Sequence, residues 1–247
     1  MNAADRPVVC FTVDAEQDCP PYLGTFRGME QGLPRLIDLL ADLAVPATIF
    51  ATGDVARRFP AVISRLVAAG HELGCHGDTH RDFSMLTAAE AAAELRASLD
   101  ALRRFAEVSS FRAPYLRFTP EHLPLLAAAG IRTDSSQAVY KRGPCQRPGP
   151  VPAGLRRIPV SVTSSVLRLP GWIRQPWMAS LREPVVLFVH PWEFVDLRRE
   201  RLRIDCRFRT GEPALAAVRG VILWWRGRGA SFQRLCDVAP LPKALSR

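Results

Sequence analysis

The sequence of 247 residues predicts an α/β fold built on a parallel β-sheet. Short apolar runs that read as strands alternate with segments whose apolar residues recur at helical spacing, and Gly or Pro stands at most of the boundaries. Several of the apolar runs also end in ionisable residues, which is typical of strands whose carboxyl ends form a site. The pattern alone leaves open whether the sheet is an open one or a closed barrel.

The first part of the chain supplies regular strand–helix pairs. The expected strands are apolar runs at residues 8–13, 47–52, 71–75, 109–113 and 131–136. The expected helices lie between them, at 32–45, at 60–69, from Thr87 onward and at 119–130. Glu90 stands three residues after Thr87, the pattern of a capping box at a helix start. Gly70 and Gly130 mark helix ends, because glycine readily adopts the left-handed backbone found there.

The remainder of the chain is less regular. Residues 140–157 are rich in Pro, Gly and basic side chains, which predicts a long surface loop. Later strands are expected at 156–162, 184–190 and 230–235, with a helix at 213–226. Neither a repeat nor a break in composition divides the sequence, so we expect a single domain over residues 1–247.

The chain is basic, with a formal net charge of +9 that comes mostly from arginine. Either an anionic neighbour or a solvated arginine-rich surface would explain this charge. No nucleic-acid-binding motif accompanies it, so nucleic acid is not an expected partner. No apolar stretch approaches the ~20 residues that span a bilayer, and the amino terminus lacks the pattern of a secretory signal. Because the six cysteines are scattered, reduced thiols in a cytoplasm are expected.

Histidines are few and clustered. Three of the five lie in GHELGCHGDTH, residues 70–80. His76 and His80 stand four residues apart, a spacing that lets two imidazoles reach one metal ion, although a chance pair on a surface loop is the alternative. His71 precedes the strand and is expected to be structural.

Acidic residues follow the first strand in FTVDAEQD. Residues two apart on a strand share a face, so Asp14 and Glu16 are expected on the same side, while Asp18 is expected in the turn. The carboxyl ends of parallel strands meet at one edge of a sheet, which should bring this pair close to the polar residues that end later strands. Those residues are Arg112 in FRAPY, Asp134 in TDSS, and His190 and Glu193 in HPWEF.

Four of these motifs, FTVDAEQD, HGDTH, RAPY and LFVH, occur in the order found in polysaccharide deacetylases. The sequence therefore resembles the chitooligosaccharide-deacetylase homology group, the carbohydrate esterase family 4 type, over about residues 8–190. The resemblance implies a distorted (β/α)7 barrel and hydrolysis of an N-acyl group on an amino sugar. It also implies one divalent metal, most often Zn²⁺ with Co²⁺, Mn²⁺, Fe²⁺ or Ni²⁺ as alternatives, held by one carboxylate and two histidines.

The first motif has an uncommon form in this sequence. The usual form has two adjacent aspartates, base then metal ligand, but here Ala15 follows Asp14. The sequence DAE matches a branch with Asp-x-Asp or Asp-x-Glu. The resemblance then implies that Glu16, His76 and His80 hold the metal while Asp14 acts as the base, and the reverse assignment of the two carboxylates stays open.

The other motifs imply further roles. His190 would donate a proton to the departing amine, and Arg112 would hold the base ionised, since an opposite charge favours a carboxylate. Tyr115, whose backbone N–H could hold the oxyanion, and Trp192 are expected substrate contacts. Asp134 would tune the acid histidine or touch the substrate, with a simple cap at the end of a strand as the alternative.

Two segments bear on the substrate. TFRGMEQGLPRL, residues 25–36, resembles a loop of deformylases that act on aminoarabinose linked to polyprenyl phosphate. VTSSVLRLPGWIRQPWM, residues 162–178, sets Trp172 and Trp177 among arginines, an interfacial composition, although a core helix with its cap is the alternative. We expect an N-acylated or lipid-linked sugar as substrate, and contact with an anionic membrane surface at its inner face.

Two other functions are compatible with the same sequence. One is a metal-dependent hydrolase of cyclic amides or ureides on the same barrel. The other is a homologue without catalytic activity that binds carbohydrate or membrane. The first would not need the apolar and basic segment at 162–178, and the second predicts little effect of changing Asp14.

Overall fold

The computed structural model describes residues 6–239. A parallel sheet has the strand order β6-β5-β4-β3-β2-β1-β7, and a short strand, β8, pairs with the start of β1. The strands are β1 (Val8–Ala15), β2 (Ala47–Ala51), β3 (Glu72–Cys75), β4 (Ser110–Phe111), β5 (Thr133–Asp134), β6 (Arg156–Arg157), β7 (Val185–Val189) and β8 (Ser231–Phe232). Each lies within or next to an expected strand.

The sheet curls strongly, so that its two edge strands approach each other. Ser161, which follows β6, donates its N–H to the carbonyl of Val186 in β7 at 2.9 Å. The N–H of Val186 in turn donates to Ser161 Oγ, also at 2.9 Å. These bonds close the curled sheet through a loop rather than through a strand pair. The choice between open sheet and barrel is therefore settled, and the distorted (β/α)7 barrel implied by the resemblance is confirmed.

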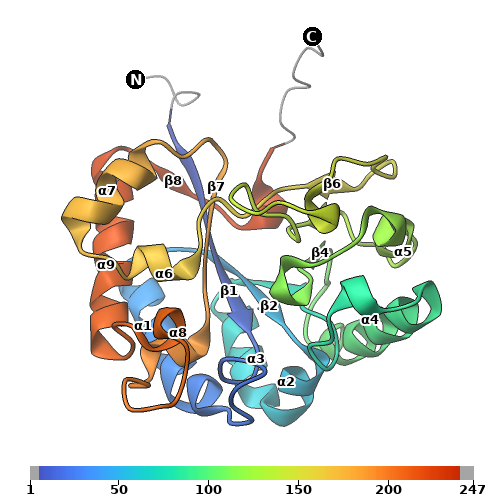
Figure 1. Ribbon diagram of the computed structural model, residues 1–247, viewed down its shortest axis with the longest axis horizontal. Coiled ribbons are helices and arrows are strands. Elements are labelled where there is room, and N and C mark those ends of the chain that lie inside the picture. Colours follow the sequence, from blue (N-terminus) through green and yellow to red (C-terminus); the bar gives the residue numbers. More distant parts are fainter. Residues whose placement is uncertain (1–5, 240–247) are drawn as a thin grey trace.

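Helices cover the outside of the curled sheet, as Figure 1 shows. They are α1 (Leu33–Asp42), α2 (Gly53–Arg58), α3 (Pro60–Ala68), α4 (Ala88–Leu102), α5 (Leu123–Ala128), α6 (Ser164–Leu167), α7 (Gly171–Ala179), α8 (Ile204–Arg207) and α9 (Glu212–Gly227). Short helical turns lie at Gly28–Gly32, Phe83–Met85, Pro114–Leu116, Pro120–His122, Pro144–Gln146, Pro191–Phe194 and Leu235–Asp237. Within residues 6–239 no helix combines the length and apolar character that a bilayer crossing would need.

The predicted capping box is present at the start of α4. Glu90 donates its N–H to Thr87 Oγ1, and Thr87 donates its N–H to the carboxylate of Glu90. Helices α2 and α8 were not predicted, whereas α6 and α7 lie in the region of residues 162–178, where a core helix with its cap was the alternative. Helix α2 has six residues and α8 has four, so neither leaves much periodic pattern in the sequence.

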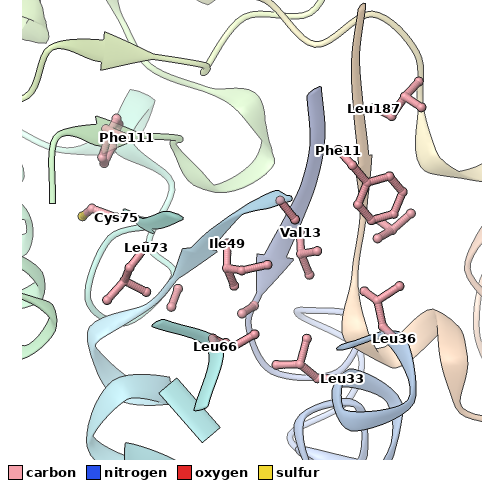
Figure 2. Close-up of a cluster of buried hydrophobic side chains, with 14 of the residues drawn as sticks. Phe11, Val13, Leu33, Leu36, Ile49, Leu66, Leu73, Cys75, Phe111 and Leu187 are labelled. Atoms are coloured by element: carbon pink, nitrogen blue, oxygen red, sulfur yellow. The ribbon is translucent and has the colours of Figure 1, made fainter. Parts of the chain in front are cut away.

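Strand residues alternate between two cores. Phe11 and Val13 of β1 point outward and pack against α1 and the neighbouring strands in the main core shown in Figure 2. The residues between them point inward. Cys10 of β1, Phe50 of β2 and Phe188 of β7 belong to a smaller cluster that fills the inside of the barrel.

The inward-facing series continues past the carboxyl ends of the strands, where it becomes polar. On β1 it runs from Cys10 through Thr12 to Asp14 and then Glu16. On β7 it runs through Phe188 to His190. The alternation of the strands therefore places the ionisable residues at the open carboxyl end of the barrel, above an apolar floor.

Candidate active site

Glu16, His76 and His80 meet at this end of the barrel. Oε2 of Glu16 lies 2.5 Å from Nε2 of His80 and 3.2 Å from Nε2 of His76. One ligand atom from each residue lies within 4.8 Å of the others, and all three side chains are buried. Two imidazoles and one carboxylate form a donor set that suits a divalent metal, so these residues fit the expected ion.

A backbone carbonyl and a carboxylate hold His76 and the loop before His80 in place. Nδ1 of His76 donates to the backbone carbonyl of Arg112 at 2.7 Å, which orients the ring so that its Nε2 faces Glu16. His80 has a left-handed backbone with φ of 61°. The loop before it is anchored by Glu94 of α4, whose carboxylate accepts the N–H groups of Asp78 and Thr79. The buried carboxylate of Glu94 therefore fixes the backbone of the loop that leads to His80.

Glu16 is held in its ionised form. Burial by itself would raise the pKa of this carboxyl group, but the charge of His80 and hydrogen bonds from His76 and His80 hold it well below its usual range. A carboxylate that binds a metal must be deprotonated, and Glu16 meets that condition.

Asp14 is engaged by Arg112. Nη1 of Arg112 lies 2.6 Å from Oδ1 of Asp14 and 2.8 Å from the hydroxyl of Thr12. The guanidinium is fully buried, donates through Nη2 to Ser135 Oγ at 3.0 Å, and stacks over the ring of Phe50 at 4.4 Å. The expected pairing of Arg112 with Asp14 is present, and contacts on several sides of the arginine fix the orientation of the carboxylate.

His190 is held by a chain of buried charges. Its Nδ1 lies 2.8 Å from Oε1 of Glu193, whose Oε2 forms a 2.9 Å ion pair with Arg168. The other nitrogen, Nε2, lies 3.8 Å from Oε1 of Glu16. Burial lowers the pKa of His190, but the hydrogen bond to Glu193 and the nearby carboxylates outweigh it and raise the pKa to about 9. Trp192 stacks on the imidazole, with ring centroids 4.8 Å apart.

These groups face a single pocket of about 340 Å³. Tyr115, with a left-handed φ of 58°, and Trp192 lie in its wall, where the sequence placed substrate contacts. Lys141 adds positive charge to the lining of the pocket, and its Nζ donates to the carbonyl of Tyr115 at 2.7 Å. Arg203 also lines the pocket, where it forms a 2.9 Å ion pair with Asp205. Sequence reasoning missed Arg168, Lys141 and Arg203, because none of them belongs to a motif or ends an expected strand.

Asp134 lies away from the pocket. Its carboxylate pairs with Nε of Arg157 at 2.8 Å and accepts the N–H of Ser136 at 3.0 Å. The carboxylate is buried and already has these two partners, as a cap at the end of a strand would have, and the contact of Asp134 with the substrate stays a prediction. His71 accepts the N–H of Ala47 at its Nδ1, which is the structural role expected of it.

The segment 25–36 also has a role outside the pocket. Asp18 organises its start by accepting the N–H groups of Arg27 and Gly28. A Cβ at Gly28 would collide with the backbone of Trp192, and one at Gly32 would collide with the carbonyl of Pro191. The two glycines therefore let this segment pack closely against the turn that follows His190, and the segment supports that wall of the site without lining it.

Sequence comparison identifies relatives of this chain. Residues 2–133, just over half of the chain, match the family model described as polysaccharide deacetylase. The chain is 36% identical over 101 residues to a chitooligosaccharide deacetylase of Sinorhizobium fredii. This alignment covers 40% of this chain and 47% of that protein. It is 31% identical over 115 residues to a peptidoglycan deacetylase of Helicobacter pylori, covering 46% and 39%. The matches thus span less than half the length of these relatives.

Solved structures share the fold at low sequence identity. A peptidoglycan N-acetylglucosamine deacetylase superposes with a TM-score of 0.63 at 17% identity, covering 94% of this chain and 87% of that one. A family 4 carbohydrate esterase from Streptomyces lividans superposes with a TM-score of 0.62 at 18% identity, covering 91% of this chain and 90% of that one. A pseudoenzyme of that family from Bacillus anthracis gives 0.63 at 16%, covering 94% and 65%. The matching family model and the shared fold lead to one conclusion: this chain belongs to the polysaccharide deacetylase family.

Proposed function

We propose that this chain is a metal-dependent hydrolase that removes an N-acyl group, acetyl or formyl, from an amino sugar. One observation carries the proposal: a single pocket unites the cluster of Glu16, His76 and His80 with an arginine-held aspartate, Asp14, and a partly buried histidine, His190. The names of the relatives, deacetylases of chitooligosaccharide and peptidoglycan, support a sugar amide as the substrate.

Glu16, His76 and His80 would hold the metal. Their donor set suits Zn²⁺, with Co²⁺, Mn²⁺, Fe²⁺ or Ni²⁺ as alternatives. When bound, the ion would polarise the amide carbonyl and lower the pKa of water in the pocket. We assign the ligand role to Glu16 and not to Asp14, because Glu16 approaches both imidazoles while Asp14 is occupied by Arg112. This assignment is what an Asp-x-Glu branch of the family would have.

Asp14 would accept the proton of the attacking water. The buried Arg112 binds Oδ1 of Asp14 and so orients the carboxylate in the pocket. Tyr115 lies in the pocket wall, where its backbone N–H would stabilise the oxyanion that forms on the carbonyl oxygen.

His190 would donate a proton to the departing nitrogen, without which an amide C–N bond does not break. Its Nδ1 is occupied by Glu193, so the proton to be donated is the one on Nε2, the nitrogen nearer to Glu16. Glu193, held by Arg168, is a positioning residue that fixes the ring and keeps it protonated. Trp192 completes the wall beside the imidazole.

For the substrate we propose a sugar of the bacterial envelope, lipid-linked through a polyprenyl phosphate, handled at the inner face of the membrane. Lys141 in the lining of the pocket and the net charge of +9 support an anionic substrate. This location implies a cytoplasmic protein.

The test is release of acetate or formate from a panel of N-acyl sugars and lipid-linked sugars. The protein is assayed as purified, after complete removal of metal, and after reloading with Zn²⁺. We expect release to disappear with the metal and to return on reloading. Release that survives metal removal, or no release from any substrate while metal is bound, would refute the proposal.

A further inference from the structure

Helix α7 exposes apolar residues and buries a cation. Arg174 is 8% exposed, and its Nη1 donates to the backbone carbonyls of Leu167 and Leu169, at 3.0 Å each. Trp172 is 79% exposed and Trp177 is 47% exposed. Leaving two indoles in water forgoes the free energy that their burial would provide. The outer face of α7 is therefore poorly suited to water as its permanent neighbour.

An apolar hollow of about 290 Å³ lies beside α6, the helix that precedes α7. It is lined by Ser165, Val166, Leu169, Ile204, Asp205 and Phe208. Ile204 of α8 is 70% exposed beside it. Ser165 and Asp205 also line the active-site pocket, so the hollow adjoins the mouth of that pocket.

Arginines flank Ile204 and Phe208, which line this hollow, along the chain. The segment 198–209, which contains α8, carries six arginines. Arg199, Arg201 and Arg209 are exposed, and within the described part of the chain no acidic side chain forms an ion pair with them. Arg209 directly follows Phe208, and Arg201 stands three residues before Ile204; both Phe208 and Ile204 line the hollow. Apolar residues and free positive charges thus occupy the same part of the surface.

We propose that Trp172, Trp177, Ile204, Arg199, Arg201 and Arg209 form a docking surface for a membrane of anionic phospholipids. Indoles and arginines are the side chains that favour the boundary between headgroups and acyl chains. Arginines near such a surface gain from its negative potential. A second copy of this chain is the less suitable occupant, because a twofold interface would set the same cations against one another.

Docking would bring the mouth of the pocket to the membrane. The hollow that Ile204 lines adjoins the pocket through Ser165 and Asp205, so an N-acyl sugar attached to a lipid could enter the pocket without leaving the bilayer. The inference rests on the proposed function only for the use of the pocket. Membrane binding itself depends on the docking surface alone and can be measured without substrate.

The experiment is co-sedimentation of the full chain with phosphatidylcholine vesicles, with and without phosphatidylglycerol. We expect binding to the anionic vesicles that weakens with salt. The double variant Trp172→Ser/Trp177→Ser should bind at least about tenfold more weakly, because the apolar contact is lost. The double variant Arg201→Gln/Arg209→Gln should bind anionic vesicles about fivefold more weakly per arginine removed, and its binding to neutral vesicles should not change. Met85→Ser, which removes an 80% exposed apolar side chain elsewhere, should bind like the wild type.

Several outcomes would overturn the inference. These are no binding to anionic vesicles, equal losses in Met85→Ser and in the tryptophan variant, or a dimer that the tryptophan changes dissociate. Circular dichroism of each variant shows whether it is folded. Acyl release from a soluble N-acyl sugar should stay unchanged in the tryptophan variant. Intact release without vesicle binding removes this inference alone, whereas absent release with intact vesicle binding removes the proposed function alone.

Discussion

Arg112 is the residue on which the geometry of the proposed base depends. It is fully buried, and its guanidinium has partners in Asp14, Thr12 and Ser135. Removing one partner of a buried ion pair leaves the other charge without compensation, which is costlier than losing an exposed pair. The site and the stability of the barrel interior therefore share this side chain.

We predict that Arg112→Met lowers the free energy of unfolding by about 3–5 kcal/mol, because it leaves Asp14 buried and unpaired. Urea denaturation measures the change. Arg132→Ala is the matched control, since it breaks the exposed pair of Arg132 with Glu107 and should cost less than about 1 kcal/mol. Equal effects of the two substitutions would contradict the role given to Arg112.

Glu193 sets the protonation of His190 in the proposed mechanism. Glu193→Gln keeps the shape of the side chain but removes the negative charge that helps raise the pKa of His190 to about 9. The proposed activity needs protonated His190 and falls as pH rises through its pKa. The alkaline limb of the kcat profile should therefore move to lower pH in the variant. An alkaline limb at the same pH in both proteins would argue against this chain of charges.

Local sequence explains most of the site at this scale. Asp14, Glu16, His76, Arg112 and His190 each stand at the end of an apolar run, so the geometry of parallel strands predicts their convergence. Asp134 follows the same rule but lies opposite an arginine, Arg157, on the neighbouring strand β6, and that arginine takes up its carboxylate. A partner across strands leaves no signal in the local sequence. Arg168, at the end of α6, was missed because its partner, Glu193, is likewise distant in the sequence.

At the scale of elements, the turn at Gly28–Gly32 supports the turn at Pro191–Phe194 that follows His190. The close approach requires glycine at Gly28 and Gly32. It gives the segment 25–36 a structural role, whereas the sequence alone related this segment only to the substrate. Long helices such as α1 and α4 were predictable from periodicity and capping, because each has several turns in which the pattern repeats. The four-residue helix α6 has too few turns for that, and α7 contains an internal proline, Pro176.

We predict that Gly28→Ala lowers both stability and the proposed activity, although Gly28 lies outside the pocket wall. The added methyl group would press on the backbone of Trp192 and displace the wall beside His190, at a cost of about 1–3 kcal/mol. Thermal unfolding and the rate of acyl release measure the two effects. Gly24→Ala is the control, because a Cβ at Gly24 has no neighbour within 4 Å and should leave both unchanged. A Gly28 variant as stable and active as the Gly24 variant would exclude the supporting role.

At the scale of the whole molecule, the sequence predicted a parallel α/β fold but could not decide between sheet and barrel. The deciding contacts join Ser161 to Val186, between a loop and a strand, and neither residue is marked by a pattern. Once the barrel closes, the inward series of each strand ends at one opening. The hollow lined by Ile204 shares Ser165 and Asp205 with the pocket at that opening, where the proposed membrane contact would place the substrate.

The central claim is that Glu16, His76 and His80 hold a metal while Asp14 acts as the base. The most direct test is the rate of acyl release by Asp14→Asn, measured on protein whose metal content is determined in the same sample. We predict a loss of about 10²–10⁴-fold with the metal content of the wild type retained. Loss of the metal together with the activity would make Asp14 a ligand, and an undiminished rate would show that Asp14 is not the base. Either result would contradict the account.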